Sequence, residues 1–495
     1  MHVHLVGVSG TGMGALAALF REAGEEVSGS DVAFDPPIGP ALRELGIRCM
    51  TGYDAGHLEP RPDLVVVGNA IRRGNAEAEA AERAGIERTS MSAALRSRFL
   101  ARRRPLVVAG THGKTTTSAM CAWLLSRAGF DPGWFIGGVP KGMPSGARVG
   151  STKIRPDRGR APFVVEGDEY DAVYWHKQPK FLDYVGVGTD DVVVLTSVEH
   201  DHVDIYPDVA SYEAAFRALL RGVPAGGLLV CDARDATVRR LVAEEARAHA
   251  SFYALDGDDT GGVTPVWLGA PAAPTADGSQ TFDLYAGGVA CGRYVLRVPG
   301  LHNVRNAIAA VAACAEGFGA LTADARGHLA AFEGVRRRQD LIGEPRGVRV
   351  YDDFAHHPTA VDETLRALRA RHPGGALWAV FEPRSATACR AVHQAGYARA
   401  FGAADHVVLA PLGRANIPEG ERLDLSLLTR ELGPKADAAS GVDAIVARIA
   451  REARPGDTVA LLSNGAFGGI HERLLTALRA DGTHPTPRPE SPKSP

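Results

Sequence analysis

The chain has 495 residues, a formal net charge of −3 at pH 7 and a hydrophobic content of 45%. This length predicts about three domains, and the apolar content is sufficient for several buried cores. The charge gives no electrostatic reason to expect a nucleic-acid partner, and no apolar run is long enough to span a membrane. The six cysteines form no Cys-x-x-Cys pair and the chain opens directly on a strand-like segment, so we expect reduced thiols and a cytoplasmic location.

The first elements predict a βαβ unit with a glycine-rich turn. A strand over 2–7 and a helix over 15–22 flank the turn, and a second strand over 25–29 leads to Asp31. The turn contains Gly10, Thr11, Gly12, Met13 and Gly14. A glycine turn followed by an acid about twenty positions on is typical of dinucleotide enzymes, so an NAD-type dehydrogenase is one alternative. The glycine spacing is not the regular one, and such a turn can equally hold the diphosphate of a nucleotide-sugar.

A buried strand over 62–68 ends in a polar loop over 69–75. Ligands of open α/β sheets bind outside the carboxyl ends of the strands. Asn69 and Asn75 are therefore candidates for substrate contact, the alternative being ordinary loop residues. The segment 101–105 is interpreted as a linker between domains. The basic runs 102–104 and 336–338 are interpreted as solvent-exposed surfaces.

The most specific motif is a loop between an apolar strand over 105–108 and a helix over 118–128. Its residues are Gly110, Thr111, His112, Gly113, Lys114, Thr115 and Thr116. Glycines let backbone N–H groups turn toward phosphate oxygens, and the helix N-terminus adds partial positive charge. Lys114 would contact the β- and γ-phosphates of a nucleoside triphosphate, and the Thr115 hydroxyl would bind Mg²⁺. Val108 replaces the first glycine of the common phosphate loop, so the loop is a shorter variant; the alternative is a chance glycine-rich turn.

Two further strands end in clusters of polar residues. A strand over 162–165 ends at Glu166, where a metal-coordinating or water-holding acid belongs. A strand over 192–195 leads to the cluster 199–204, which contains His202. This cluster is interpreted as functional, although Mg²⁺ usually takes oxygen ligands. Between the strands, 150–161 is interpreted as a basic surface loop.

Polar motifs also precede two predicted helices near the C-terminus. His302, Asn303 and Asn306 come before an Ala-rich helix over 307–316. An Asn at a helix entry can cap the helix, but a cap would explain only one of the three residues. A strand over 348–351 is followed by a polar stretch that includes Asp353 and His356, and then by a helix over 361–370.

Four motifs together resemble the Mur ligase family, whose members are ATP-dependent enzymes that add amino acids or peptides to UDP-N-acetylmuramate. The motifs are Gly-Thr-His-Gly-Lys-Thr-Thr (110–116), Pro-Gly-Leu-His-Asn-Val-Arg-Asn (299–306), Arg-Arg-Arg (336–338) and Asp-Asp-Phe-Ala-His-His-Pro (352–358). The resemblance implies an α/β fold of three domains. These are a Rossmann-like UDP-sugar-binding domain over 1–104, a central P-loop ATPase-type domain for ATP and magnesium over 105–325, and a Rossmann-like amine-acceptor-binding domain over 326–480. We expect the Pro-rich tail over 481–495 to be disordered.

The resemblance also implies roles for individual residues, with ATP and Mg²⁺ as cofactors. The catalytic residues would be Lys114, Glu166, His202 and Arg338, and the metal ligands Thr115, Glu166 and His202. ATP would be bound by residues 110–116 together with His302, Asn303, Asn306, Asp353 and His356. The UDP-sugar would be bound by Gly10, Thr11, Gly12, Met13, Gly14, Asp31 and Asn69.

Within the family, two activities fit the chain. One adds the recovered tripeptide L-alanyl-γ-D-glutamyl-meso-diaminopimelate to UDP-N-acetylmuramate in peptidoglycan recycling; the other adds L-alanine to the same sugar. The stretches 68–75, 381–387 and 462–471 favour the tripeptide activity, with Arg384, Ser463 and Asn464 as acceptor contacts. The implied partners are small-molecule substrates, with no nucleic acid, membrane or obligate protein partner. A non-catalytic binder that kept the fold is the remaining alternative, and the complete metal site argues against it.

Overall fold

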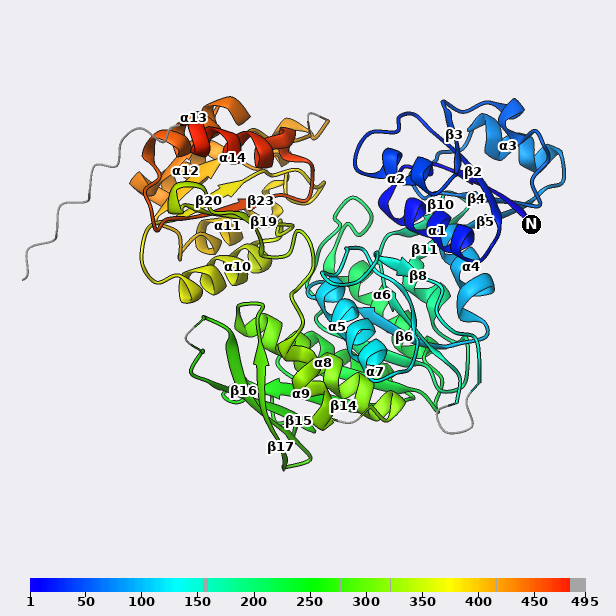
Figure 1. Ribbon diagram of the computed structural model, residues 1–495, viewed down its shortest axis with the longest axis horizontal. Coiled ribbons are helices and arrows are strands. Elements are labelled where there is room, and N and C mark those ends of the chain that lie inside the picture. The colour runs from blue at the N-terminus through cyan, green and yellow to red at the C-terminus, as the bar shows by residue number, and fades with distance from the viewer. Residues whose placement is uncertain (155–158, 276, 321, 415, 481–495) are drawn as a thin grey trace, which may run out of the picture. The chain divides into compact units, whose positions relative to one another are not determined.

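Three mainly parallel β-sheets form the scaffold of the chain (Figure 1). The computed structural model describes residues 1–154, 159–275, 277–320, 322–414 and 416–480. They form two compact units that meet in sequence between Val335 and Arg336. The first unit contains two of the three sheets and the second unit contains one. The predicted α/β fold with parallel sheets is confirmed.

The N-terminal sheet is parallel throughout and has the order β3-β2-β1-β4-β5. Its strands are β1 (His2–Val6), β2 (Glu26–Asp31), β3 (Arg48–Thr51), β4 (Leu64–Val67) and β5 (Glu87–Ser90). The helices beside it are α1 (Thr11–Glu22), α2 (Ile38–Glu44), α3 (Ala76–Arg83) and α4 (Met91–Leu95). Strands β1 and β4 are largely buried, as expected for a parallel sheet covered on both faces. The strand order reverses between β1 and β4, and this is where ligands of such sheets bind.

Helix α1 begins four residues earlier than the sequence predicts. The Gly14 N–H donates to the Gly10 carbonyl over 2.7 Å, so the helix already includes most of the glycine-rich turn. Met13, on α1, is 5% exposed. A Cβ added to Gly68, which follows β4, would lie 3.2 Å from the Cγ of Met13. Close packing of this helix on the sheet therefore explains part of the glycine content.

The central sheet has the order β17-β16-β15-β14-β13-β12-β6-β9-β7-β8 and is parallel between β15 and β7. Its strands are β6 (Arg104–Ala109), β7 (Gly133–Phe135), β8 (Ala147–Arg148), β9 (Pro162–Glu166), β12 (Val192–Leu195), β13 (Leu228–Asp232), β14 (His249–Leu255), β15 (Trp267–Ala272), β16 (Gln280–Ala286) and β17 (Val289–Leu296). Its helices are α5 (Lys114–Arg127), α6 (Val209–Gly222), α7 (Ala236–Glu245), α8 (Leu301–Phe318) and α9 (Thr322–Ala330). A separate hairpin consists of β10 (Asp171–Val173) and β11 (His176–Pro179). Strands β6, β9 and β12 lie next to one another, so the loops that follow their carboxyl ends gather at one edge.

Two sequence predictions about this region are wrong. The helix predicted over 307–316 begins at Leu301 with Gly300 at its N-cap, so Asn303 and Asn306 lie inside its first turns and neither caps it. The solvated-face interpretation fails for Arg103, which is 2% exposed. Its guanidinium donates to the carbonyls of Phe99 and Ser151 over 2.6 and 2.9 Å, so it connects segments instead of facing water.

The sheet of the second unit has the order β18-β19-β23-β20-β21-β22 and is parallel except for β18. Its strands are β18 (Asp340–Gly343), β19 (Arg349–Asp353), β20 (Leu377–Phe381), β21 (His406–Leu409), β22 (Ala436–Ala438) and β23 (Thr458–Leu462). Its helices are α10 (Pro358–Arg371), α11 (Gln394–Ala400), α12 (Leu425–Leu432), α13 (Val442–Glu452) and α14 (Ile470–Ala480). The loops after β19, β20 and β23 follow three adjacent strands, and they contain the polar motifs of this unit.

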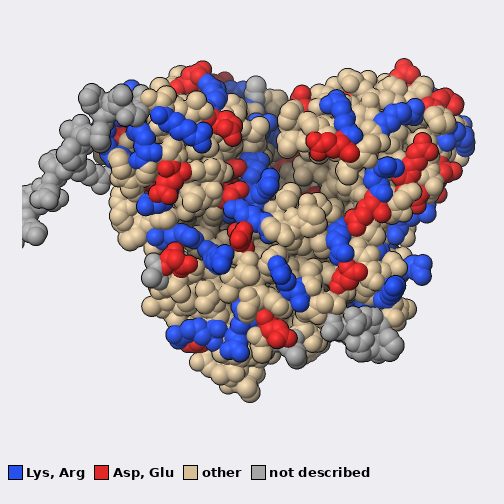
Figure 2. Space-filling view, in the orientation of Figure 1, with Lys and Arg blue, Asp and Glu red and all other residues tan. Residues whose placement is uncertain are grey.

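Charged side chains of both signs are interspersed over the visible face (Figure 2). Among the described residues, no helix combines the length and apolar character that crossing a bilayer requires. The predicted tail over 481–495 and part of the predicted basic loop, 155–158, lie outside the described residues.

Asp232, at the end of β13, should make stability depend on pH. Burial raises the pKa of this carboxyl to about 6, although the Arg234 N–H donates to it over 2.8 Å. The folded protein then keeps a proton that the unfolded chain releases near pH 4, so stability falls as pH rises from about 4 to 6. We expect Asp232→Asn, which removes the ionisation, to stabilise the protein at pH 7 by up to about 3 kcal/mol. Thermal unfolding should show this gain at pH 7 and little difference at pH 4; an equal effect at both values would contradict the assignment.

Candidate active site

The loop between β6 and α5 is shaped by two glycines with positive φ. Gly110 has φ +124°, and a Cβ there would lie 2.3 Å from the Thr196 Oγ1. Gly113 has φ +79°, and a Cβ there would lie 2.4 Å from the Asn306 Oδ1. Neither position can hold a side chain without movement of its neighbours. The loop thus passes closely over the end of β12 and the first turns of α8.

Further hydrogen bonds hold the loop against the segment after β12. The Thr111 N–H donates to the Ser197 carbonyl over 2.9 Å, and the His112 N–H donates to the Ser197 hydroxyl oxygen over 3.0 Å. The Thr111 hydroxyl donates to the Glu199 carbonyl over 2.8 Å, and the His112 ring lies 2.8 Å from the Glu199 carboxylate. Residues 110–113 therefore form a fixed turn at the N-terminus of α5, the geometry that binds phosphate groups elsewhere.

Lys114, the first residue of α5, is directed back into the turn. Its ammonium donates to the Gly110 carbonyl over 2.6 Å, to the Thr111 carbonyl over 3.2 Å and to the Glu169 carboxylate over 2.8 Å. Burial alone would lower the pKa of Lys114, but the charge and hydrogen bond of Glu169 together with the charges of Glu166 and Asp168 raise it above the ordinary value. The structure therefore places a fixed positive charge at the turn 110–113.

Oxygen donors suited to Mg²⁺ lie beside this lysine. The Thr115 hydroxyl donates to the Glu166 carboxylate over 2.8 Å, and the other Glu166 oxygen accepts from the Gly137 N–H over 2.6 Å. A hydroxyl and a carboxylate together match the hard oxygen ligands that Mg²⁺ prefers. Thr115 and Glu166, predicted separately from two motifs, are thus brought into contact.

His202, in the loop after β12, lies beside Glu169, the carboxylate that accepts from Lys114. Its Nε2 lies 3.8 Å from Glu169 Oε2, its ring packs 4.5 Å from that of Tyr170, and its φ is +54°. Glu169 Oε2 is buried and has no hydrogen-bond partner in the described structure. Asp168 is held by the Lys180 ammonium at 2.5 Å, and although burial opposes ionisation, this pairing lowers its pKa to about 2. The His202 imidazole and the Glu169 oxygen that accepts no hydrogen bond in the described structure are groups that can coordinate a cation.

The motif at the start of α8 contributes Asn303 and Asn306. The Asn303 amide donates to the Pro299 carbonyl over 2.7 Å, and the Asn306 amide donates to Asn303 Oδ1 over 3.2 Å. Asn306 Oδ1 lies directly beside Gly113. His302 occupies the same first turn of α8 and is half-buried. Asn306 is therefore fixed against the turn 110–113, with Asn303 holding it in place.

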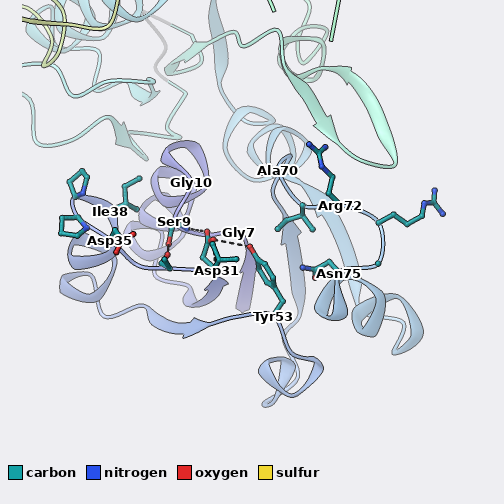
Figure 3. A pocket seen from close by; sticks show the side chains of 17 residues that line it. Gly7, Ser9, Gly10, Asp31, Asp35, Ile38, Tyr53, Ala70, Arg72 and Asn75 are labelled. Carbon is teal, nitrogen blue, oxygen red and sulfur yellow. Dashed lines mark hydrogen bonds between the residues drawn. The ribbon is translucent and has the colours of Figure 1, made fainter. Parts of the chain in front are cut away.

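A second site lies at the carboxyl ends of the N-terminal strands. It is a cavity of about 810 Å³ between the segments 31–38 and 70–75, within the range of small-ligand pockets. Figure 3 shows Ser9, Asp31 and Tyr53 near its centre, with Ile38 and Asn75 on opposite sides. Asp31 Oδ2 accepts from the Ser9 N–H over 2.8 Å, and the Tyr53 hydroxyl donates to Asp31 Oδ1 over 3.3 Å. Burial, followed by the charge of Asp31, raises the pKa of Tyr53 to about 12.

The structure separates the residues predicted for this second site. Gly10 and Asp31 line the cavity, whereas Met13 is buried in the core, and Gly12 and Gly14 pack closely on Met91 and Ile38. Thr11 opens α1, and Asn69 is half-buried at the end of β4. Asn75 lines the cavity but its side chain also caps α3, accepting from two backbone N–H groups over 3.1 Å each.

In the second unit, Asp353 is the last residue of β19 and His356 follows it, whereas Arg338 precedes β18. The two oxygens of Asp353 accept from the Gln339 and Ala355 N–H groups over 2.7 Å each. The His356 Nδ1 lies 3.0 Å from the Phe354 carbonyl, and the Arg338 guanidinium lies 4.9 Å from the centre of the Phe354 ring. The Asp353 carboxylate therefore connects the segment that contains His356 to the segment that contains Arg338.

The predicted acceptor residues lie at the ends of β20 and β23, which are adjacent strands. The Ser463 hydroxyl donates to the Glu382 carboxylate, and the Arg384 guanidinium lies 3.8 Å from the same carboxylate. The Arg384 side chain is 46% exposed. Asn464 Oδ1 is buried and has no hydrogen-bond partner in the described part of the chain. A carboxylate, a guanidinium and an unpaired amide oxygen can together bind a ligand that carries both charges.

Three residues of these sites were missed by the sequence reasoning: Glu169, Tyr53 and Glu382. Glu382 lies within the stretch 381–387, Glu169 lies three residues after Glu166, and each follows a buried strand closely. Their positions after strand ends were an available signal. Tyr53 belongs to no motif, and only the folded arrangement brings it to Asp31.

Comparison with known protein families gives three matches along the chain. Residues 2–103 match "Mur ligase family, catalytic domain", residues 108–314 match "Mur ligase middle domain" and residues 337–465 match "Mur ligase, glutamate ligase domain".

Individual relatives cover nearly the whole chain. The UDP-N-acetylmuramate–L-alanyl-γ-D-glutamyl-meso-2,6-diaminoheptandioate ligase of Escherichia coli K12 is 37% identical over 97% of this chain and 98% of its own. The UDP-N-acetylmuramate–L-alanine ligase of Kineococcus radiotolerans is 41% identical over 82% of this chain and 80% of its own. Among solved structures, the murein peptide ligase of Psychrobacter arcticus is 34% identical, covers 97% of this chain and 99% of its own, and has a TM-score of 0.71.

Proposed function

The chain belongs to the Mur ligase family, and on that basis we propose that it joins L-alanyl-γ-D-glutamyl-meso-diaminopimelate to UDP-N-acetylmuramate with cleavage of ATP to ADP and phosphate. As a member of this family it is an ATP-dependent ligase that forms an amide bond. The observation that carries the tripeptide assignment is the similarity, over 97% of the chain, to two relatives that bear this activity in their names.

The proposed reaction has two steps. The lactyl carboxylate of the sugar attacks the γ-phosphorus of ATP, the bond to the β,γ-bridging oxygen breaks, and an acyl phosphate and ADP form. The free α-amine of the tripeptide then attacks the acyl carbon, phosphate leaves, and the amine nitrogen loses its proton. Activation is needed because a carboxylate is a poor electrophile.

We assign the ATP phosphates to the turn 110–113 and to Lys114, whose fixed charge would neutralise the phosphoryl group during transfer. Thr115, Glu166 and His202 would hold Mg²⁺, which supplies further neutralisation of that charge when bound. Residues 110–116, His302, Asn303 and Asn306 are the proposed nucleotide contacts in the first unit. Arg338, Asp353 and His356 are the proposed contacts in the second.

We assign UDP-N-acetylmuramate to the 810 Å³ cavity of the N-terminal domain. Gly10 and Asp31 belong to its lining, and Arg72 and Arg73 supply positive charge at its rim, as a diphosphate requires. The tripeptide is assigned to Glu382, Arg384, Ser463 and Asn464. Its diaminopimelate end carries an ammonium and carboxylates, which the Glu382 carboxylate and the Arg384 guanidinium complement.

L-Alanine is the alternative acceptor, favoured by the relative that is 41% identical over 82% of the chain. A panel of amine donors distinguishes the two activities. With ATP, Mg²⁺ and UDP-N-acetylmuramate present, we expect kcat/KM for the tripeptide to exceed that for L-alanine by at least about tenfold. L-Alanine is too small to reach the polar groups of the acceptor site, so they would be left without partners. Release of phosphate measures turnover, and omission of the sugar is the control. Preferential use of L-alanine would move the assignment to the alanine ligase.

A further inference from the structure

One buried carboxylate connects the segments that line the nucleotide-sugar cavity. Glu77 is the second residue of α3 and its side chain is 0% exposed. Its Oε2 accepts from the Ser30 hydroxyl and lies 3.1 Å from the His4 Nε2. Its Oε1 lies 2.6 Å from the His57 Nδ1 and accepts from the Asp54 N–H over 3.2 Å. Four partners from four positions in the chain thus meet on one side chain.

Two of these positions, Ser30 and Asp54, adjoin residues that line the cavity. Ser30 precedes Asp31 on β2, and Asp54 follows Tyr53, so Glu77 holds the backbone on both sides of the Asp31–Tyr53 hydrogen bond. Asn75, at the rim, caps the helix that carries Glu77. His4 lies on β1, the strand that leads into Gly7 and the glycine-rich turn.

The carboxylate is ionised in this setting. Burial opposes ionisation, but the hydrogen bonds from His4 and Ser30 hold the pKa of Glu77 below its ordinary value. The negative charge also lies in the first turn of α3, where the helix dipole favours it. Charge-assisted hydrogen bonds are stronger and more directional than neutral ones, so their geometry fixes the segments that they connect.

We propose that Glu77 is a positioning residue for UDP-N-acetylmuramate: it touches no substrate itself, but it holds Asp31, Tyr53 and the 70–75 segment in the arrangement that binds the nucleotide-sugar. This inference rests on the proposed function. It separates substrate binding at this cavity from the chemistry at Lys114, because the four hydrogen-bond partners of Glu77 lie on β1, on β2 and in the segment between β3 and β4.

Steady-state kinetics of Glu77→Gln tests the role. Glutamine keeps the size of the side chain but removes its charge and one of its two acceptor oxygens. We expect KM for UDP-N-acetylmuramate to rise about tenfold or more, corresponding to the loss of about 1.4 kcal/mol of binding. KM for ATP and for the tripeptide, and kcat at saturating sugar, should stay within about twofold of wild type.

Asp191→Asn is the matched control. Asp191 is also 0% exposed and its carboxylate accepts from the Val187 and Gly188 N–H groups over 3.0 Å each, but it lies before β12, at the end opposite the phosphate-binding turn. We expect this variant to change the melting temperature without a selective change in KM for the sugar. If Glu77→Gln raises all three KM values together, or changes only the melting temperature, Glu77 is merely structural and the proposal is wrong.

Ser30→Ala provides a second variant if Glu77→Gln fails to fold. It removes a single donor to Glu77, so we expect a smaller rise, about threefold, in KM for the sugar alone. An unchanged KM would also overturn the proposal. The wild type is assayed first: if it does not use UDP-N-acetylmuramate at all, the proposed function fails and the positioning role with it. If the wild type turns over UDP-N-acetylmuramate but KM for the sugar is unchanged in both variants, the positioning role is refuted and the proposed function stands.

Discussion

Replacement of Lys114 by alanine should reduce turnover by at least about two orders of magnitude, the loss typical of removing one preorganised group that stabilises transition-state charge. The ammonium is held by the carbonyls of Gly110 and Thr111 and by Glu169, so it does not need to be ordered during the reaction. Its pKa is raised, so the charge is present throughout the ordinary pH range. Phosphate release at saturating ATP and sugar measures the effect, and we expect it to lie mainly in kcat.

Lys435→Ala is the matched control for this variant. Lys435 also donates to two backbone carbonyls, those of Phe401 over 2.8 Å and Ala404 over 3.2 Å, but it has no place in the proposed sites. It should therefore keep near-normal turnover. Because Lys114→Ala also leaves Glu169 buried without its cation, circular dichroism must show that the variant is folded. Near-normal activity in a folded Lys114→Ala protein would mean that the turn is not the phosphate site.

The central strands could be predicted well from the sequence because parallel strands covered on both faces are continuous apolar runs. Strand β12 has the predicted bounds, Val192–Leu195, and β9 differs only by the inclusion of Glu166. Since polar residues that follow such strands gather at one edge of the sheet, Thr115 and Glu166 could be placed in one site before their contact was known. The helix starts were predicted less well. Helices α1 and α8 both begin earlier than expected, because glycine and asparagine in a first turn do not signal a helix.

Contacts between segments distant in sequence could not be predicted from a single chain. Glu77 lies 47 positions from Ser30 and 73 from His4, and its neighbours in sequence suggest only an ordinary exposed helix. Its role depends on the register of β1 and β2 and on the course of the loop after β3. Arg103 is a similar case: a run of three arginines predicts a solvated face, but the fold buries the middle one against backbone carbonyls.

Gly110→Ala should cost at least about two orders of magnitude in turnover, comparable to the loss expected for Lys114→Ala. The added Cβ would lie 2.3 Å from Thr196 Oγ1 and 2.8 Å from both the nitrogen and the oxygen of Ser197, and alanine rarely adopts the φ of +124° found there. The loop must then move away from β12, which displaces the Gly110 carbonyl that accepts from Lys114. Kinetics and ATP titration calorimetry measure the consequence, and we expect ATP binding to weaken along with kcat.

Gly24→Ala separates this steric effect from the general cost of positive φ. Gly24 has φ +87°, but a Cβ there would meet no atom within 4 Å among the described residues, and it lies after α1, outside the proposed sites. This variant should lose stability without losing ATP affinity. If Gly110→Ala behaved in the same way, backbone strain alone would account for its effect. A loss of ATP binding in Gly110→Ala but not in Gly24→Ala would show that the close approach of the turn to Ser197 positions the phosphate groups. Lys114 would then act from within that fixed turn.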